Sequence, residues 1–299
     1  MLTRSIRFSA TAAALFFTQQ ACAEEYQTFI AASILSSKSS LTQDGQTTSD
    51  TNNLWSVNGT YFLDPRTSLG PLNEFDYIIQ QSSVSAGLLG DGGNRQYVIG
   101  GEYIANDWVV FGDAVYMSDS DTEILTVGFG YFLTKDIKLS ISNTSNDGIS
   151  GLADSDESFF KFTADYVLQL GDKDYVGFTY NTDEDLNVQQ LRTKYFGSLS
   201  NGRYVVLNAD LSIFDDDVFS DDTLSLGGAY YFNQFTSVGA GINVIGDTDS
   251  YSIFAKHFFN TRSSLQVSYS SSERTNVDSG FGQFSFESDS WQVNYVYQY

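Results

Sequence analysis

The chain has 299 residues, of which 37 are acidic and 15 are basic, so its formal net charge is −22 at neutral pH. A nucleic-acid partner is not expected, because phosphate contacts need clustered Lys and Arg. With one His and one Cys, the sequence predicts no transition-metal site, no cofactor and no disulfide framework. Aromatic residues form 15% of the chain and only two residues are Pro, a composition that suits a β-barrel.

The first residues have the pattern of a secretory signal peptide. Two Arg precede an apolar stretch at 8–17, which is too short to span a bilayer, and small residues follow. Cleavage is expected after Ala23, so that 1–23 is the signal peptide and 24–299 is a single exported domain. A lipid-modified Cys22 is the alternative. Cleavage after Ala23 removes the only Cys, so the domain must be stabilised by a large closed hydrogen-bonded structure or a sizeable core.

Apolar and polar residues alternate with a period of two, which is typical of β-strands whose two faces meet different surroundings. In 159–170, Phe160 and Tyr166 fall on one face, and Lys161 and Asp165 fall on the other. An antiparallel up-and-down barrel of about 16 strands is predicted, with about 14 as the alternative. The predicted strands are 25–35, 52–63, 76–89, 95–104, 107–117, 122–133, 136–145, 157–170, 173–181, 185–197, 203–214, 222–232, 235–246, 249–259, 262–272 and 287–299.

The connections alternate between short and long, as in outer-membrane barrels, which have tight periplasmic turns and longer outer loops. Both termini are therefore expected at the periplasmic end. The candidates for an inward-folded constriction loop are 36–50 and 143–156. The short connections are 105–107, 134–136, 171–173, 233–235 and 260–262, and the long ones are 36–50, 118–121, 143–156, 214–222 and 274–282.

Strands that lead into short turns end in aromatic residues, which predicts an aromatic ring at a membrane interface. The chain itself ends WQVNYVYQY, with Trp291, Tyr295, Tyr297 and Tyr299 on one face. This final strand is expected to close the barrel against the first strand. Its terminal aromatic resembles the signal read by the barrel assembly machinery, although Phe or Trp is commoner there. Outer-membrane lipid and that machinery are thus expected partners.

One predicted strand fits its pattern poorly, because 76–89 carries two Gln and two Ser at its middle. The stretch 70–84 resembles a segment of the general bacterial porin family of outer-membrane β-barrels. The matching residues are Gly70, Pro71, Leu72, Glu74, Ser82, Ser83 and Val84. The resemblance implies a water-filled channel for passive diffusion of small hydrophilic solutes and ions, and homotrimers are common among such porins.

Charged residues on the polar faces of the strands are candidates for the pore lining, where they would set ion preference. Alternatively, they simply fill a polar interior. The excess of acidic residues predicts an acidic vestibule that concentrates cations, hence a mild cation preference. The pore-lining candidates are Glu102, Asp113, Lys138, Lys161, Asp165, Arg192, Lys194, Asp210 and Lys256.

Other functions stay open at this point. A structural or adhesive barrel would have a plugged lumen, and a soluble exported β-protein would not need the aromatic ring. An enzyme is not expected: His257 is the only histidine, and period two places it on the lipid side if Lys256 faces the lumen. The acidic clusters at 119–121 and 215–222 could hold calcium, but their spacing matches no EF-hand, so solvated loops are favoured.

Overall fold

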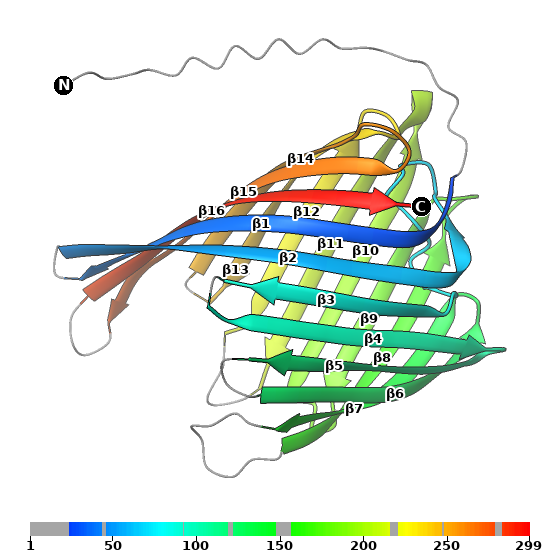
Figure 1. Cartoon of the computed structure of the whole chain (residues 1–299), viewed down its shortest axis with the longest axis horizontal. Helices are drawn as coiled ribbons and strands as arrows, with labels where there is room; N and C mark the ends of the chain where they lie inside the picture. Colours follow the sequence, from blue (N-terminus) through cyan, green and yellow to red (C-terminus); the bar gives the residue numbers. More distant parts are fainter. Residues whose placement is uncertain are drawn as a thin grey trace.

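In the computed structural model, the described residues are 24–43, 46–91, 93–118, 122–147, 157–215, 221–246, 248–278 and 283–299. They form a closed barrel of 16 strands, in which each strand pairs antiparallel with its neighbours in the sequence and β1 pairs with β16 (Figure 1). The predicted fold class and the predicted number of strands are therefore confirmed. The predicted signal peptide, 1–23, lies outside the described residues.

The strands differ in length, and one short 3₁₀ turn, η1, joins β10 to β11. The elements are β1 Glu25–Gln43, β2 Gln46–Thr67, β3 Ser83–Gly90, β4 Arg95–Ala105, β5 Trp108–Met117, β6 Thr122–Thr134, β7 Ile137–Asp147, β8 Glu157–Gln169, β9 Tyr175–Asp183, β10 Val188–Leu199, η1 Ser200–Gly202, β11 Arg203–Phe214, β12 Thr223–Tyr231, β13 Thr236–Ile245, β14 Thr248–Phe258, β15 Ser263–Asp278 and β16 Gln283–Gln298.

The barrel closes where the last strand meets the first, as the terminal sequence predicts. Pairing of β1 with β16 runs from Phe29 opposite Gln298 to Gln43 opposite Phe284. The carbonyl of Tyr299 accepts hydrogen bonds from the backbone N–H groups of Gln27 (2.8 Å) and Thr28 (2.7 Å). The chain terminus is thereby held in the ladder, and no strand edge is left open at this seam.

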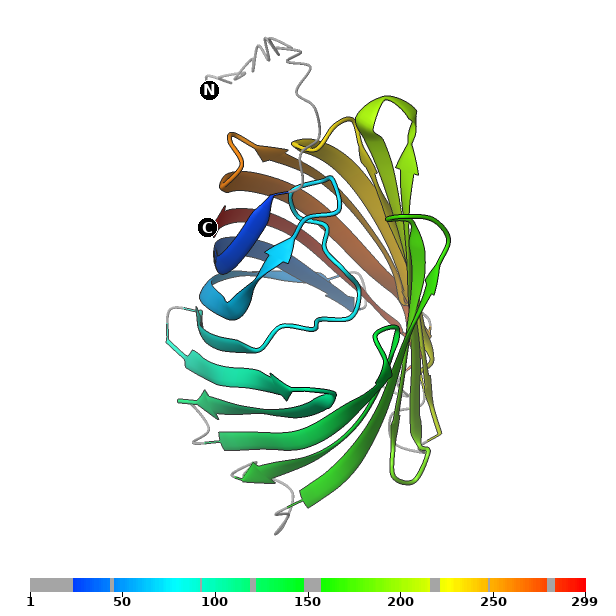
Figure 2. The ribbon, with the colours of Figure 1, turned by 90° about the vertical axis from the view of Figure 1, so that its right-hand side faces the viewer.

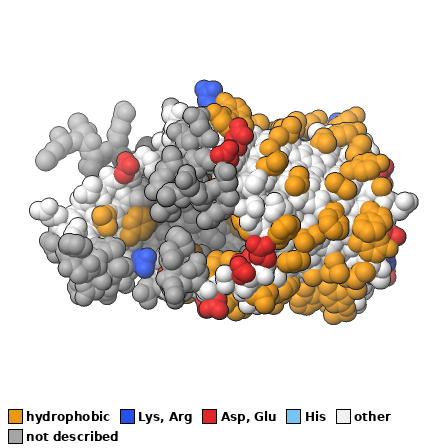
Figure 3. All heavy atoms as spheres, turned by 90° about the horizontal axis from the view of Figure 1, so that it is seen from below, with side chains coloured by type: hydrophobic (Ala, Val, Ile, Leu, Met, Phe, Trp, Pro, Cys, Tyr) orange, Lys and Arg blue, Asp and Glu red, His pale blue; other side chains and the backbone are white. Residues whose placement is uncertain are grey.

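The alternation of side chains gives the wall an apolar outside. Ile34, Ile99 and Val110 point outward and are more than 60% exposed, although they are large and apolar. Figure 3 shows hydrophobic side chains over much of the outer wall, with acidic side chains bordering this region. Such exposure is unfavourable in water and favourable in hydrocarbon, so this wall matches a lipid-facing barrel surface.

Four strands, β1, β2, β15 and β16, project beyond the others at the end away from Tyr299 (Figure 1). The prediction of a loop at 36–50 is wrong, because β1 and β2 stay paired as far as Gln43 and Gln46. The many Ser and Thr residues look like loop composition. In the hairpin they instead form cross-strand hydroxyl pairs, which stabilise a sheet.

The prediction of a strand at 76–89 is wrong in its first half. β3 begins only at Ser83, and residues 68–82 form an irregular connection from β2 to β3, which we name the floor segment. Figure 2, viewed from the end that carries Tyr299, shows this segment crossing the opening inside the ring of strands. The other described connections at this end are short, as the sequence predicts.

Candidate functional site: the barrel lumen and its floor

The floor segment packs on an apolar cluster inside the barrel. Leu69 and Ile78 are buried against large side chains that project inward from β5, β6 and β8–β12. Among these, the ring of Phe196 stacks between those of Tyr175 and Tyr204, with centroid distances of 5.8 and 5.9 Å. Apolar burial against these rings holds the segment inside the lumen, because leaving the site would expose both sets of side chains to water.

Glu74 provides the main polar anchor of the floor segment. Its Oε2 lies 2.6 Å from Nζ of Lys194 on β10, and its Oε1 accepts a hydrogen bond of 2.6 Å from the hydroxyl of Tyr231 on β12. Asn73 donates to the same hydroxyl at 3.0 Å. Glu74 is only 5% exposed, so its charge depends on these two partners for compensation.

Further contacts tie the floor segment to other sides of the barrel. The carbonyl of Leu72 accepts a hydrogen bond of 3.0 Å from the buried amide of Gln298 on β16. Phe75 packs edge-on against Phe29 of β1 at 5.4 Å. At the far end of the segment, the hydroxyl of Ser82 accepts the backbone N–H of Ile104 on β4. The segment therefore spans the mouth and is fixed to widely separated strands.

Two glycines make room for this arrangement. Gly70 has φ +152°, and an added Cβ would lie 2.5 Å from the ring of Tyr204. On β9, a Cβ at Gly177 would collide with the ring of Tyr77, which reaches up from the floor segment. The hydroxyl of Tyr77 is thereby placed 2.8 Å from Thr179 Oγ1, at the edge of the charged part of the lumen.

Strand register aligns four of the predicted pore-lining residues in one row across β7–β11. Lys138 is opposite Asp165, Asp165 is opposite Thr179, Thr179 is opposite Arg192, and Arg192 is opposite Asp210. The charges alternate in sign, with the uncharged Thr179 in the middle. We call these four charged residues, together with Thr179, the alternating row.

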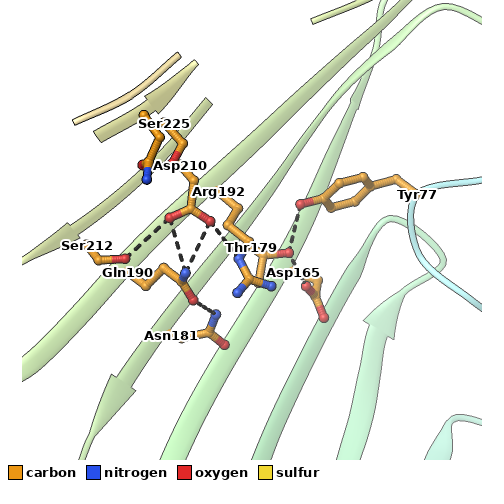
Figure 4. Close-up of polar contacts among 10 residues, drawn as sticks. Tyr77, Asp165, Thr179, Asn181, Gln190, Arg192, Asp210, Ser212 and Ser225 are labelled. Atoms are coloured by element: carbon orange, nitrogen blue, oxygen red, sulfur yellow. Dashed lines mark hydrogen bonds and ion pairs between the residues drawn. The ribbon is translucent and has the colours of Figure 1, made fainter. Parts of the chain in front are cut away.

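Side-chain contacts fix the alternating row (Figure 4). Nε of Arg192 lies 2.8 Å from Oδ2 of Asp210, and Gln190 donates to both oxygens of that carboxylate at 3.1 Å. Thr179 donates to Oδ1 of Asp165 at 2.5 Å. Both carboxylates thus accept hydrogen bonds from neutral neighbours, and Asp210 is also paired with Arg192, whose Nη groups have no partner among the described residues.

The remaining predicted pore-lining residues also lie on the inner faces of their strands. Lys138 pairs with Glu102 at 3.4 Å, and Lys194 holds Glu74 as described. Among the described residues, neither Lys161 nor Asp113 forms an ion pair. Lys256 lies 5.3 Å from the ring centroid of Phe258. The inward placement is clear for all nine residues; their role in conduction stays a prediction.

Charge is distributed unevenly around the lumen. Eight of the nine residues lie on β4–β11, whereas the facing strands carry mainly hydroxyl and amide groups, such as the pairs Ser33–Ser56 and Ser270–Ser290. Between the two walls is a cavity of about 530 Å³, bordered by Tyr77 and Arg192 on one side and by Ser250 on the other. A small solute in this cavity would meet charges on one side and neutral hydrogen-bonding groups on the other.

The predicted rim aromatics of β16 point to the outside. Trp291, Tyr295 and Tyr299 are exposed, and Tyr297 is half-buried. Trp291 also packs against Tyr269 on β15 at 4.9 Å, nearer the projecting end. Aromatic residues therefore occur at both levels of the outer wall, the arrangement expected at two membrane interfaces.

His257 is on the outer face, where its Nδ1 lies 2.9 Å from Thr236 Oγ1 and its ring packs edge-on against Phe259. It does not converge with the lumen groups. Asp119 and Asp121 lie outside the described residues, as do Asp216 and Asp217. Within the described ranges, no cluster of three or more His, Cys, Asp and Glu side chains could hold a metal ion. No helix in these ranges is long and apolar enough to cross a membrane.

Sequence reasoning missed the floor segment, and with it the roles of Glu74 and Tyr77. The signal was present: Gly70 and Pro71 interrupt the strand pattern, and the polar run that follows cannot face lipid on either register. The polar groups of that run are satisfied inside the barrel, as shown by Gln80, which donates to the carbonyl of Lys135 at 2.9 Å.

Solved structures with similar folds are outer-membrane barrels. Omp33 of Acinetobacter baumannii is 13% identical with a TM-score of 0.52, over 92% of this chain and 99% of that one. OprB of Pseudomonas putida is 6% identical with a TM-score of 0.55, over 91% and 94% of the two chains. At these identities the likeness shows the fold alone. A search of curated protein sequences gave no match.

A family model provides the assignment. The model described as "Putative general bacterial porin" matches residues 17–295, which is nearly the whole chain and includes β1–β15 and most of β16. The motif at 70–84, which suggested this family from the sequence, forms most of the floor segment and the start of β3. The chain belongs to the general bacterial porin family.

Proposed function

We propose that this protein is an outer-membrane porin through which small hydrophilic solutes and ions diffuse passively, with a mild preference for cations. An outer-membrane channel follows from the family and from the closed barrel of 16 strands. A barrel of this size is wide enough for an aqueous interior, whereas one of about eight strands is filled by side chains. The polar, charged inner wall is the observation that carries the proposal.

In this proposal the floor segment is the constriction of the channel. It lies at the end that carries Tyr299, which is the periplasmic end if both termini face the periplasm. Its contacts with β1, β4, β10, β12 and β16 leave less of the cross-section to solutes than the strands alone would. Passage of large solutes is therefore not expected.

Cation preference would come from the acidic excess of the chain, 37 acidic against 15 basic residues. Within the lumen the two signs are more evenly matched, since Arg192 pairs with Asp210 and Lys138 with Glu102. Acidic groups outside the constriction raise the local concentration of cations, and ionic strength screens this effect over a Debye length of about 8–10 Å. The preference should therefore be modest and should weaken in concentrated salt.

Export by the signal peptide at 1–23, insertion by the barrel assembly machinery and assembly as a homotrimer are part of the same proposal. The exposed aromatic Tyr299 at the end of the closing strand supports recognition by that machinery. The proposed protein acts without a cofactor and is not an enzyme.

The test of this function is a swelling assay with proteoliposomes that contain the refolded protein. Sugars of increasing size are added outside, and swelling is expected for small ones with a sharp decline as size increases. Liposomes that carry well-folded barrels and never swell would overturn the proposal.

A second function has one observation in its favour. Because the floor segment is packed and hydrogen bonded across the mouth, the barrel could be a structural or adhesive protein with a plugged lumen. The absence of swelling, together with cell adhesion that depends on the projecting β1–β2 hairpin, would favour this alternative.

A further inference from the structure

The alternating row and the wall that faces it suggest which solutes the channel favours. Along the row, adjacent strands are about 4.8 Å apart, so Asp165 on β8 and Arg192 on β10 are separated by roughly 10 Å at the backbone. Their side chains both project into the lumen, with Thr179 between them (Figure 4). A small molecule beside Thr179 would therefore have one group of each sign within reach.

Both charged groups have unused hydrogen-bonding capacity. Arg192 uses Nε for Asp210, and its Nη groups have no described acceptor. Its side chain is 55% exposed to the lumen. Asp165 uses Oδ1 for Thr179, and Oδ2 has no described donor. The free edge of a guanidinium matches a carboxylate, and a free carboxylate oxygen accepts from an ammonium group.

A solute that carries only one sign of charge is attracted by one residue of the row and repelled by the residues of its own sign next to it. An anion near Arg192 is also close to Asp165 and Asp210, whereas a cation near Asp165 is also close to Lys138 and Arg192. Only a molecule that carries both signs can satisfy the row without opposing it. The row thus discriminates by charge pattern rather than by net charge.

The cavity that borders the row at Arg192 and Asp210 fits the same kind of solute. Arg192 and Asp210 line the cavity of about 530 Å³ together with Ser225, Asn243 and Ser250 from the neutral wall. Ser225 already donates to Asn243 at 2.6 Å, which orients the amide. Hydroxyl and amide groups can bind the polar remainder of a solute without adding charge.

We infer that the alternating row forms a subsite for small zwitterions of the α-amino acid type. The carboxylate lies on the Nη groups of Arg192, the ammonium lies on Oδ2 of Asp165, and the side chain faces the hydroxyl wall. This inference rests on the proposed porin function, because the subsite acts on solutes that pass through the lumen.

The experiment compares four solutes of almost equal size in proteoliposomes: glycine as zwitterion, glycolate as anion, ethanolamine as cation and ethylene glycol as neutral molecule. Entry rates are measured for the wild type and for Arg192→Gln, Asp165→Asn and Lys38→Gln. Lys38 is exposed on the outer face of β1, so its variant controls for a change of one charge. Heat-dependent mobility on SDS gels checks that each variant folds.

The wild type is expected to admit glycine faster than both glycolate and ethanolamine. Loss of either charge-assisted contact should reduce the glycine advantage by about threefold to tenfold. Arg192→Gln should instead favour ethanolamine and Asp165→Asn should favour glycolate, while Lys38→Gln behaves like the wild type. An unchanged glycine advantage in both row variants, or equal entry of all four solutes, overturns the inference.

Potassium chloride conductance of the same preparations separates the two proposals. Folded barrels that conduct the salt but do not prefer glycine would refute the subsite and leave the porin function intact. Folded barrels that conduct neither salt nor solute would refute the porin function itself.

Discussion

Nζ of Lys194, on the wall of the barrel, lies 2.6 Å from Oε2 of Glu74, in the segment that crosses the barrel mouth. The two residues are 120 positions apart in the sequence. Their ion pair, with the hydroxyl of Tyr231, is the strongest polar link between the floor segment and the strands. The position of the floor segment in the barrel mouth, and hence the conductance, should therefore depend on this ion pair.

Replacing Glu74 with Gln should loosen the floor segment. The amide keeps the size of the side chain and an oxygen for Tyr231, but it removes the charge that compensates Lys194. The free energy of unfolding should fall by about 1–3 kcal/mol. The effect is smaller than for a fully buried ion pair, because Lys194 is partly exposed. Single-channel recordings should show higher and noisier conductance than the wild type.

The matched control is Asp76→Asn, which removes a charge from an exposed side chain of the same segment. Its conductance should match that of the wild type. Equal conductance of Glu74→Gln and wild type would show that the ion pair does not hold the mouth.

Packing of Tyr77 predicts that Gly177→Ala destabilises the protein. The new methyl group would collide with the ring of Tyr77, so the ring must leave its place beside Thr179. Overpacking of this kind costs about 1–3 kcal/mol. Urea-induced unfolding of the refolded barrel measures the difference.

Gly227→Ala is the control for that substitution. Gly227 also faces the lumen, but the nearest atom to its added Cβ is the carbonyl oxygen of Ala240 at 3.5 Å. This variant should unfold at nearly the wild-type urea concentration. If both variants unfold alike, Tyr77 is not packed on Gly177 in solution.

The buried amide of Gln298 predicts a third effect. In Gln298→Leu, the buried carbonyl of Leu72 loses its donor, while the carbonyl of Thr261 keeps the hydroxyl of Tyr26; the free energy of unfolding should fall by about 1–3 kcal/mol. The temperature at which the folded band disappears from SDS gels should fall. Gln292→Leu on the same face of β16 should change this temperature little, because the side-chain amide of Gln292 has no hydrogen-bond partner among the described residues. Equal shifts for the two variants would contradict this role of Gln298.

The orientation of the wall can be tested within one strand, β6. Val127 points outward and is 54% exposed, whereas its neighbour Thr126 faces the lumen opposite Asp113. Val127→Arg should destabilise the inserted barrel by about 2–4 kcal/mol, because it places a charge on the lipid-facing side near the middle of a bilayer. Thr126→Arg should be tolerated, because the new side chain faces the lumen and can pair with Asp113. Folding yields into lipid vesicles compare the two variants, and the reverse order would refute the assigned faces.

The periodic parts of the fold could be predicted from the sequence, because lipid on one side and water on the other impose alternation. In β8, Phe160 and Tyr166 point outward while Lys161 and Asp165 point inward, as their spacing indicates. The prediction of a loop at 36–50 is wrong because the Ser- and Thr-rich ends of β1 and β2 lack apolar alternation, although they pair as strands.

The candidate site could be predicted only as a set of inward charges. Which charges meet depends on register: Arg192 and Asp210 become partners only because β10 and β11 pair opposite these positions. The contact of Glu74 with Lys194 depends on a connection that folds back into the barrel, and no periodic pattern describes such a segment. Its composition could indicate that it was not a lipid-facing strand, but not where its side chains would bind.

Ion conductance tests the central claim most directly. The refolded protein is inserted into a planar bilayer, and single-channel current and reversal potential are recorded in a potassium chloride gradient. The porin proposal predicts discrete current steps and a reversal potential shifted modestly in the direction of cation selectivity. Inserted, correctly folded barrels that pass no current would contradict it.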